Sequence, residues 1–166
     1  MRAKRGFTLV EILIVVVILG ILAAIVIPQF TSASTEAKES ALKSDLQAIR
    51  SQIELYKIHH NDNLPGTQAT NDFDTAMITK TNQDGQTASQ ATDPTTCVYG
   101  AYMQKLPTNP FNDLSDVGTG VTRLPGDAAG SNLTGWYFVT SGVDAGLFQA
   151  NDDKQNPLTS EYHTNY

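Results

Sequence analysis

The chain has 166 residues, with 11 Lys and Arg against 17 Asp and Glu, and therefore a formal charge of −6. Its apolar residues are unevenly spread, because residues 7–27 supply 18 apolar side chains in 21 positions. The length allows one membrane-associated element and one domain of roughly 100 residues. Length and composition exclude a collagen, a disulfide-stapled miniprotein and a transporter with several membrane spans.

The charge is divided between a basic N-terminus and an acidic remainder. Arg2, Lys4 and Arg5 contribute +3, which leaves +8 and −17, or −9, for residues 7–166. An acidic body is a poor partner for a phosphate backbone, so no nucleic-acid binding is expected. Cys97 is the only cysteine, which excludes an intrachain disulfide and a Cys-based zinc site within this chain.

Residues 7–27 form the first predicted element, a transmembrane helix. The run is uncharged except for Glu11, and a helix of this length spans ~32 Å, close to the ~30 Å hydrocarbon core of a bilayer. The positive-inside rule keeps the basic N-terminus on the cytoplasmic side and places the acidic remainder outside. A secretory signal peptide is disfavoured, because the run exceeds the usual length of about 7–15 residues and lacks an A-x-A-like exit.

A plain membrane anchor gives no reason for the carboxylate of Glu11. Its burial costs ~2.5–3.5 kcal/mol at the bilayer centre and less near an interface. Glu11 therefore needs a partner or a purpose. The alternative is a side chain that reaches the lipid headgroups and has no protein partner.

The residues around Glu11 resemble the type IV prepilin signature. Lys4-Arg5-Gly6 is followed by Phe7 and by one acidic residue, five positions after that glycine. The resemblance implies that a prepilin peptidase cuts between Gly6 and Phe7 on the cytoplasmic side. It also implies that the new amine of Phe7 is methylated and that the apolar helix stays attached to the chain.

The same resemblance implies an assembly role for Glu11, which would pair with the N-terminal amine of an adjacent subunit during filament growth. This is physically reasonable, because a carboxylate in a low-dielectric helix bundle is best neutralised by a cation from its own or a neighbouring chain.

Gly20 and Pro28 are two predicted weak points of the helix. Pro28 removes the helical partner of the Ala24 carbonyl, and Gly20 lowers the helix preference by ~1 kcal/mol relative to Ala. In assembled relatives the matching stretch loses helical order, so a helix break between these residues is what the resemblance implies for the filament. A kink at the membrane exit is the alternative for an isolated subunit.

Residues 28–60 are predicted to form an amphipathic helix. Apolar side chains recur at spacings of 4, 3, 4 and 3 along one stripe, and these are Leu42, Leu46, Ile49, Ile53 and Tyr56. Glu39 and Lys43 are assigned to the opposite, polar face as a favourable i,i+4 pair. The stripe predicts packing against a sheet. His59 and His60 are expected at a fraying helix end rather than in a metal site.

Residues 61–166 are predicted to form a globular head. Residues 72–79 have the spacing of a short helix, and residues 135–140 and 145–151 give the best strand signals and predict a β-hairpin. Residues 120–124 are a candidate third strand. The predicted fold class is α+β and pilin-like, with a long N-terminal helix packed against a small antiparallel sheet.

The head resembles, more loosely, the G-type major pseudopilins of type II secretion. The segment from Leu106-Pro107 to Phe111 is similar to their Leu-Pro-x-x-Pro-aromatic stretch, and an aromatic hairpin precedes an acidic tail. Those pseudopilins bind calcium in a late loop, which residues 141–146 match only in part. We expect no required cofactor and favour solvated loop carboxylates. The candidate calcium ligands are Asp144, Asn151, Asp152 and Asp153, because calcium takes six to eight oxygens.

The sequence contains no P-loop, H-E-x-x-H or G-x-S-x-G motif, so no enzymatic activity is expected. The resemblance implies a structural subunit of a type II secretion pseudopilus or type IV pilus-like filament that supports protein secretion across the envelope. Expected partners are copies of the chain in a helical homopolymer, other pilins and pseudopilins, the prepilin peptidase and methyltransferase, and an inner-membrane assembly platform. The expected location is the bacterial inner membrane, single-pass with a periplasmic head, and then a periplasmic pseudopilus or surface filament.

Two other functions stay open at this point. One is a major or minor type IV pilin of a surface pilus, used in adhesion, motility or DNA uptake, and the other is a membrane-tethered binding module. A pseudopilus is favoured because the head is G-like and lacks the C-terminal cysteine pair common in surface pilins. The predicted organisation is a leader over residues 1–6, a membrane or filament-core helix over 7–27, an amphipathic helix over 28–60 and a head over 61–166.

Overall fold

The structure is a computed structural model that describes residues 6–68, 72–124, 132–157 and 159–166. The chain divides into two compact units, Met1–Lys38 and Glu39–Tyr166, called here the N-terminal unit and the head. Residues 1–5 of the predicted leader, with its three basic side chains, lie outside the described residues. In chain order the elements are α1 (Leu9–His59), α2 (Phe73–Ile78), the 3-10 turn η1 (Pro94–Thr96), β1 (Val117–Gly120), β2 (Trp136–Val139), β3 (Phe148–Ala150) and the 3-10 turn η2 (His163–Asn165).

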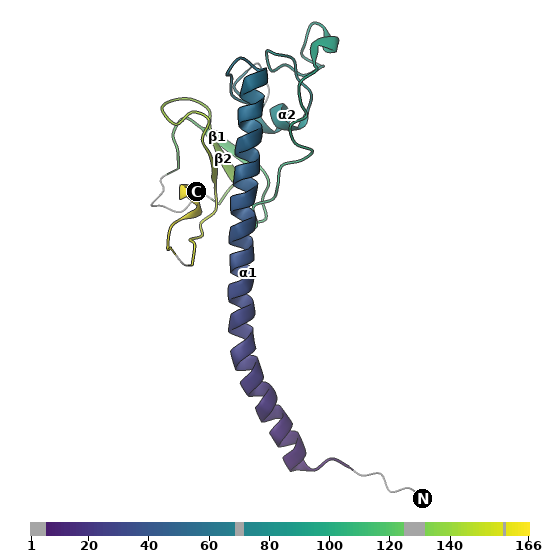
Figure 1. The fold of residues 1–166 in the computed structure, drawn as a ribbon, viewed down its shortest axis with the longest axis vertical. Coiled ribbons are helices and arrows are strands. Elements are labelled where there is room, and N and C mark those ends of the chain that lie inside the picture. Colours follow the sequence, from purple (N-terminus) through teal and green to yellow (C-terminus); the bar gives the residue numbers. More distant parts are fainter. Residues whose placement is uncertain (1–5, 69–71, 125–131, 158) are drawn as a thin grey trace, which may run out of the picture. The chain divides into compact units, whose positions relative to one another are not determined.

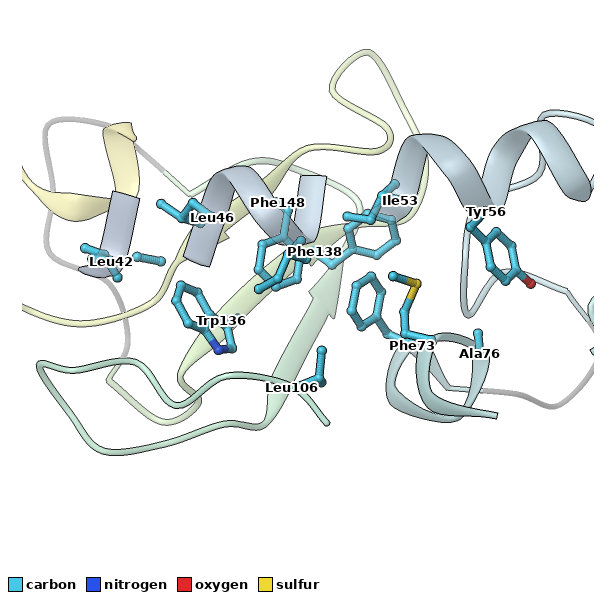
Figure 2. Close-up of a cluster of buried hydrophobic side chains, with 13 residues drawn as sticks. Leu42, Leu46, Ile53, Tyr56, Phe73, Ala76, Leu106, Trp136, Phe138 and Phe148 are labelled. Carbon is cyan, nitrogen blue, oxygen red and sulfur yellow. The ribbon is translucent and has the colours of Figure 1, made fainter. Parts of the chain in front are cut away.

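The core of the head lies between α1 and the sheet, as the apolar stripe predicts. Figure 2 shows side chains of α1 directed toward aromatic rings that come from β2, β3 and α2. The rings of Phe73 and Phe138 lie 4.7 Å apart, and those of Phe73 and Phe148 lie 5.3 Å apart. The five stripe residues of α1 are all at most 1% exposed, and they are Leu42, Leu46, Ile49, Ile53 and Tyr56.

The sheet has the order β1-β2-β3, and its two strands nearest the C-terminus form the predicted hairpin. Strands β2 and β3 are antiparallel, with Phe138 opposite Phe148. In Figure 1, β1 and β2 lie beside the part of α1 that belongs to the head. Trp136 and Phe138 are fully buried in the core, while Tyr137 between them is only half-buried.

The third strand differs from the prediction in position and in direction. It lies at Val117–Gly120 instead of residues 120–124, and it pairs with β2 in parallel, so the expectation of a wholly antiparallel sheet was wrong. Gly118 and Gly120 explain the weak strand signal, because glycine is depleted in strands. A Cβ on Gly120 would lie 1.8 Å from the Tyr137 hydroxyl, so the missing side chain leaves room for that ring.

The end of α1 is ordered by packing, which corrects the prediction that it frays. His60 is fully buried, and its ring stacks on that of Tyr56 with centroids 3.7 Å apart. Its Nε2 lies 2.9 Å from the Thr81 hydroxyl, and burial lowers the pKa of this histidine. His59 ends the helix with its Nδ1 2.9 Å from the Tyr102 hydroxyl.

The predicted short helix is present as α2, and its N-terminus is capped. The Asp72 carboxylate accepts a hydrogen bond of 2.8 Å from the Thr75 N–H, which satisfies one of the free donors of the first turn. Asp74 follows in that turn. Burial is the largest cause of a rise in the pKa of Asp74 to about 6, and the charges of Asp72 and Asp116 add to it.

We expect Asp74→Asn to remove a loss of stability that the parent chain shows as the pH rises from about 4 to about 6. The raised pKa means that the folded state binds more protons than the unfolded state in this range, so the free energy of unfolding falls as Asp74 ionises. Urea unfolding of the full chain in detergent micelles at several pH values measures this. The exposed Asp84→Asn is the matched control, and an equal pH dependence of parent and Asp74→Asn would contradict the assignment.

Candidate functional site

The N-terminus of α1 is closed by a reciprocal pair of hydrogen bonds between Thr8 and Glu11. Glu11 Oε2 accepts bonds of 2.8 Å from the Thr8 N–H and 2.9 Å from the Thr8 hydroxyl. In return, the Glu11 N–H donates to Thr8 Oγ1 at 3.2 Å. This is a capping box, in which a Thr and a Glu three residues later satisfy free backbone donors of the first turn. The T-x-x-E spacing at residues 8–11 signals it in the sequence, although no capping box was predicted there.

The predicted cleavage point lies just before this capped helix. Gly6 and Phe7 are exposed and outside any regular element, and the Phe7 side chain is 85% exposed. α1 begins two residues later, at Leu9. Gly6 and Phe7 are therefore accessible and free of helix or strand hydrogen bonding, which suits cleavage by a peptidase.

The first part of α1 is apolar on every side rather than along one stripe. The large apolar side chains from Leu9 to Ile27 are between 40% and 81% exposed. The helix is long and apolar enough to cross a membrane, and none of its most apolar stretch is buried inside the protein. A helix that is hydrophobic all round requires lipid or other apolar helices as its surroundings.

α1 continues through Gly20 and Pro28 without interruption. Near the proline, side-chain hydroxyls supply hydrogen bonds to helix carbonyls. Thr31 donates to the Ile27 carbonyl at 3.1 Å, and Ser32 donates to the Pro28 carbonyl at 3.2 Å. The loss of helical order implied for the filament therefore stays a prediction about the assembled state.

Inside the head, three buried side chains from distant parts of the sequence form a line of hydrogen bonds. His163 Nε2 lies 2.7 Å from Glu39 Oε1, and His163 Nδ1 lies 2.7 Å from Asp152 Oδ1. The His163 and Asp152 side chains are fully buried, and that of Glu39 is 8% exposed. We call these three residues the carboxylate–histidine chain. It joins α1, the segment after β3, and η2.

The other carboxylate oxygens of Glu39 and Asp152 also accept hydrogen bonds. Glu39 Oε2 accepts hydrogen bonds from the Asn156 amide at 3.2 Å and from the Tyr166 hydroxyl at 3.1 Å. Asp152 Oδ2 accepts one from Asn109 Nδ2 at 2.8 Å. Buried polar networks stabilise a fold when their members are satisfied in this way.

Comparisons with known proteins agree with the motif at the N-terminus. A family model described as the prokaryotic N-terminal methylation motif matches residues 1–27. The type II secretion system core protein G of Vibrio cholerae is 31% identical over 113 residues, which cover 68% of this chain and 69% of that protein. The protein of the same name from Pseudomonas aeruginosa is 38% identical over 112 residues, covering 68% of this chain and 71% of that protein. The chain belongs to the core protein G family. No solved structure matches it.

In this member of the core protein G family, the candidate calcium ligands lie in two places. Asp144 lies in the turn between β2 and β3, whereas Asn151, Asp152 and Asp153 follow β3. Asp153 is paired at the surface with Lys154, at 2.9 Å. The described residues contain no group of three or more His, Cys, Asp or Glu side chains that could hold a metal ion. Calcium binding stays a prediction.

The carboxylate–histidine chain was not predicted from the sequence, because Glu39 was assigned to the polar face of α1. That assignment was wrong, since Glu39 is buried. A signal was present, because Glu39 precedes Leu42 by three residues and so continues the 3-4 spacing of the buried stripe. Lys43, its expected partner, instead lies with its ammonium 4.5 Å from the centre of the Tyr166 ring.

Proposed function

We propose that this chain is a structural subunit of a type II secretion pseudopilus, held together by its apolar N-terminal helix. One observation carries the proposal: the methylation motif at residues 1–27 coincides with a helix whose apolar side chains are exposed all round. Such a surface is stable first in a bilayer and then among the same helices of other subunits. The work of the subunit is mechanical, and no catalytic step is assigned to it.

Before assembly, the subunit is a single-pass protein of the inner membrane with a cytoplasmic N-terminus and a periplasmic head. This topology is supported by the +3 charge of Arg2, Lys4 and Arg5 ahead of the apolar run. Its partners are further copies of the chain, other pseudopilins, the prepilin peptidase and methyltransferase, and an inner-membrane assembly platform. The family to which the chain belongs supports this set of partners.

Glu11 is the residue to which we assign subunit pairing. In the capping box, both hydrogen bonds that Glu11 accepts from Thr8 go to Oε2, and Oε1 takes part in neither. Oε1 can therefore receive the Phe7 ammonium of a neighbouring subunit while the helix stays capped. Pairing of this kind offsets the cost of keeping a carboxylate in an apolar bundle.

We expect processing to remove residues 1–6 and to add one methyl group to the amine of Phe7. Cleavage needs a prepilin peptidase, so the chain should be expressed with and without this enzyme. Mass spectrometry of the purified protein should then show the shortened, methylated chain only when the enzyme is present. Recovery of a chain cut after Ala23 or Ala24, without the apolar helix, would instead indicate an ordinary signal peptide.

Electron microscopy of cells that overproduce the chain with an assembly machinery distinguishes a pseudopilus subunit from a surface pilin and from a tethered binding module. Filaments confined to the periplasm or dependent on type II secretion components support the pseudopilus. Filaments that grow only with the machinery of a retractile pilus would indicate a surface pilin. A processed chain that stays in the membrane without any filament would indicate a tethered binding module.

A further inference from the structure

The carboxylate–histidine chain joins the beginning of the head to its end. Glu39 is the first residue of the head and lies on α1, Asp152 follows β3, and His163 begins η2. The residues at its two ends, Glu39 and His163, are separated by 124 positions in the sequence. Bringing together residues so far apart costs chain entropy, so the contacts between them have to offset that cost to hold the C-terminal segment in place.

Each ring nitrogen of His163 has a carboxylate oxygen at hydrogen-bond distance. An ionised carboxylate accepts hydrogen bonds and donates none, and both ring nitrogens of His163 lie 2.7 Å from a carboxylate oxygen. With both carboxylates ionised, both nitrogens donate a proton and the ring is a cation between two anions. Charge-assisted bonds of this length are about twice as strong as neutral ones.

The two carboxylates that face the ring favour the charged form of His163. Burial is the largest influence and lowers the pKa of His163, but the hydrogen bonds and charges of Asp152 and Glu39 raise it above its ordinary value overall. Lys154 is the other charged group beside Asp152. The ring centroids of Phe111 and Tyr166 lie 4.3 Å and 5.4 Å from that of His163. The Lys43 ammonium lies over the Tyr166 ring.

The environments of Asp152 and Asp153 do not fit a calcium ion. Calcium needs six to eight oxygen ligands, several of them from carboxylates that reach the ion together. Asp152 is completely buried, and its oxygens accept from His163, Asn109 and the Lys154 N–H. Asp153 points to the surface, where it pairs with Lys154.

We propose that the carboxylate–histidine chain is a built-in ionic clasp, in which a protonated His163 holds the C-terminal segment of the head to α1 without a metal ion. The positive charge of the ring lies between the two carboxylates, as the charge of a bound divalent cation would. The clasp goes beyond the proposed function, because it concerns how the head is held together and holds whether or not the chain assembles.

The protonation of the unaltered protein tests the clasp without any substitution. The full chain, labelled with ¹⁵N in its histidine rings, is placed in detergent micelles at neutral pH and observed by NMR. We expect His163 to give the two N–H signals and the nitrogen shifts of an imidazolium, unchanged by added CaCl₂ or EDTA. A neutral His163 ring would overturn the proposal.

Thermal unfolding of the same preparation tests the structural role of the clasp. We expect His163→Gln and Asp152→Asn each to lower the unfolding midpoint by about 10 °C, because each leaves a buried charge without its partner. The matched controls, His59→Gln and Asp153→Asn, should move it by less than about 2 °C. CaCl₂ and EDTA should leave the midpoint of the parent unchanged. A calcium-dependent rise that disappears in Asp144→Ala would overturn the proposal, even if His163→Gln fails to fold.

Discussion

Glu11→Ala is expected to abolish filament formation while leaving membrane insertion and cleavage intact. The substitution removes the one carboxylate in the apolar run and with it the partner that we assign to the Phe7 amine of the next subunit. Insertion should be easier without this charge, since a buried carboxylate costs ~2.5–3.5 kcal/mol at the bilayer centre. Membrane fractionation, mass spectrometry of the N-terminus and a filament shearing assay measure the three properties separately.

Thr8 offers a control that separates helix capping from subunit pairing. Thr8→Ala removes the hydroxyl of the capping box and should destabilise the helix start by about 1 kcal/mol, whereas Thr8→Ser keeps that hydroxyl. If Glu11 acts in pairing, Thr8→Ala should still form filaments, in reduced amount. Loss of filaments in Thr8→Ala equal to that in Glu11→Ala, with Thr8→Ser normal, would instead assign the effect to capping.

Trp136→Ala is expected to lower the free energy of unfolding of the head by about 3–5 kcal/mol. Trp136 is fully buried, and its indole N–H donates to the Pro107 carbonyl at 2.8 Å. Its ring lies 5.7 Å from that of Phe148, and Figure 2 shows both within the core. Truncation leaves a large cavity and a carbonyl without its donor. Because this is the only tryptophan, urea unfolding should be followed by circular dichroism rather than by fluorescence.

Val143→Ala is the matched control for a truncation in the head, because Val143 is fully exposed in the turn before β3. A substitution at such a surface site should change the free energy of unfolding by less than about 0.5 kcal/mol. Similar values for Val143→Ala and Trp136→Ala would contradict the placement of Trp136 in the core.

The elements that could be predicted from the sequence are those with a strong period or a strong composition. The 3-4 spacing from Leu42 to Tyr56 predicted both the helix and the face that is buried. The aromatic run Trp136–Val139 predicted a strand of the hairpin. In both, many residues act together and point to the same structure.

The features that could not be predicted depend on single polar residues or on glycines. Glu39 looks like a surface residue until the fold places it opposite His163, because its charge outweighs its position in the stripe. Strand β1 carries Gly118 and Gly120, which weaken the strand signal, and its parallel direction depends on a connection that has no sequence signature. Pairing partners far apart in the chain are decided by tertiary packing alone.

Electron microscopy of filaments sheared from cells that produce the chain together with a prepilin peptidase and a type II assembly machinery tests the central claim most directly. The parent chain should be found, processed and methylated, as the repeating subunit of these filaments, and Glu11→Ala should yield none. A chain that is processed and inserted in the membrane but absent from every filament would contradict its role as a pseudopilus subunit.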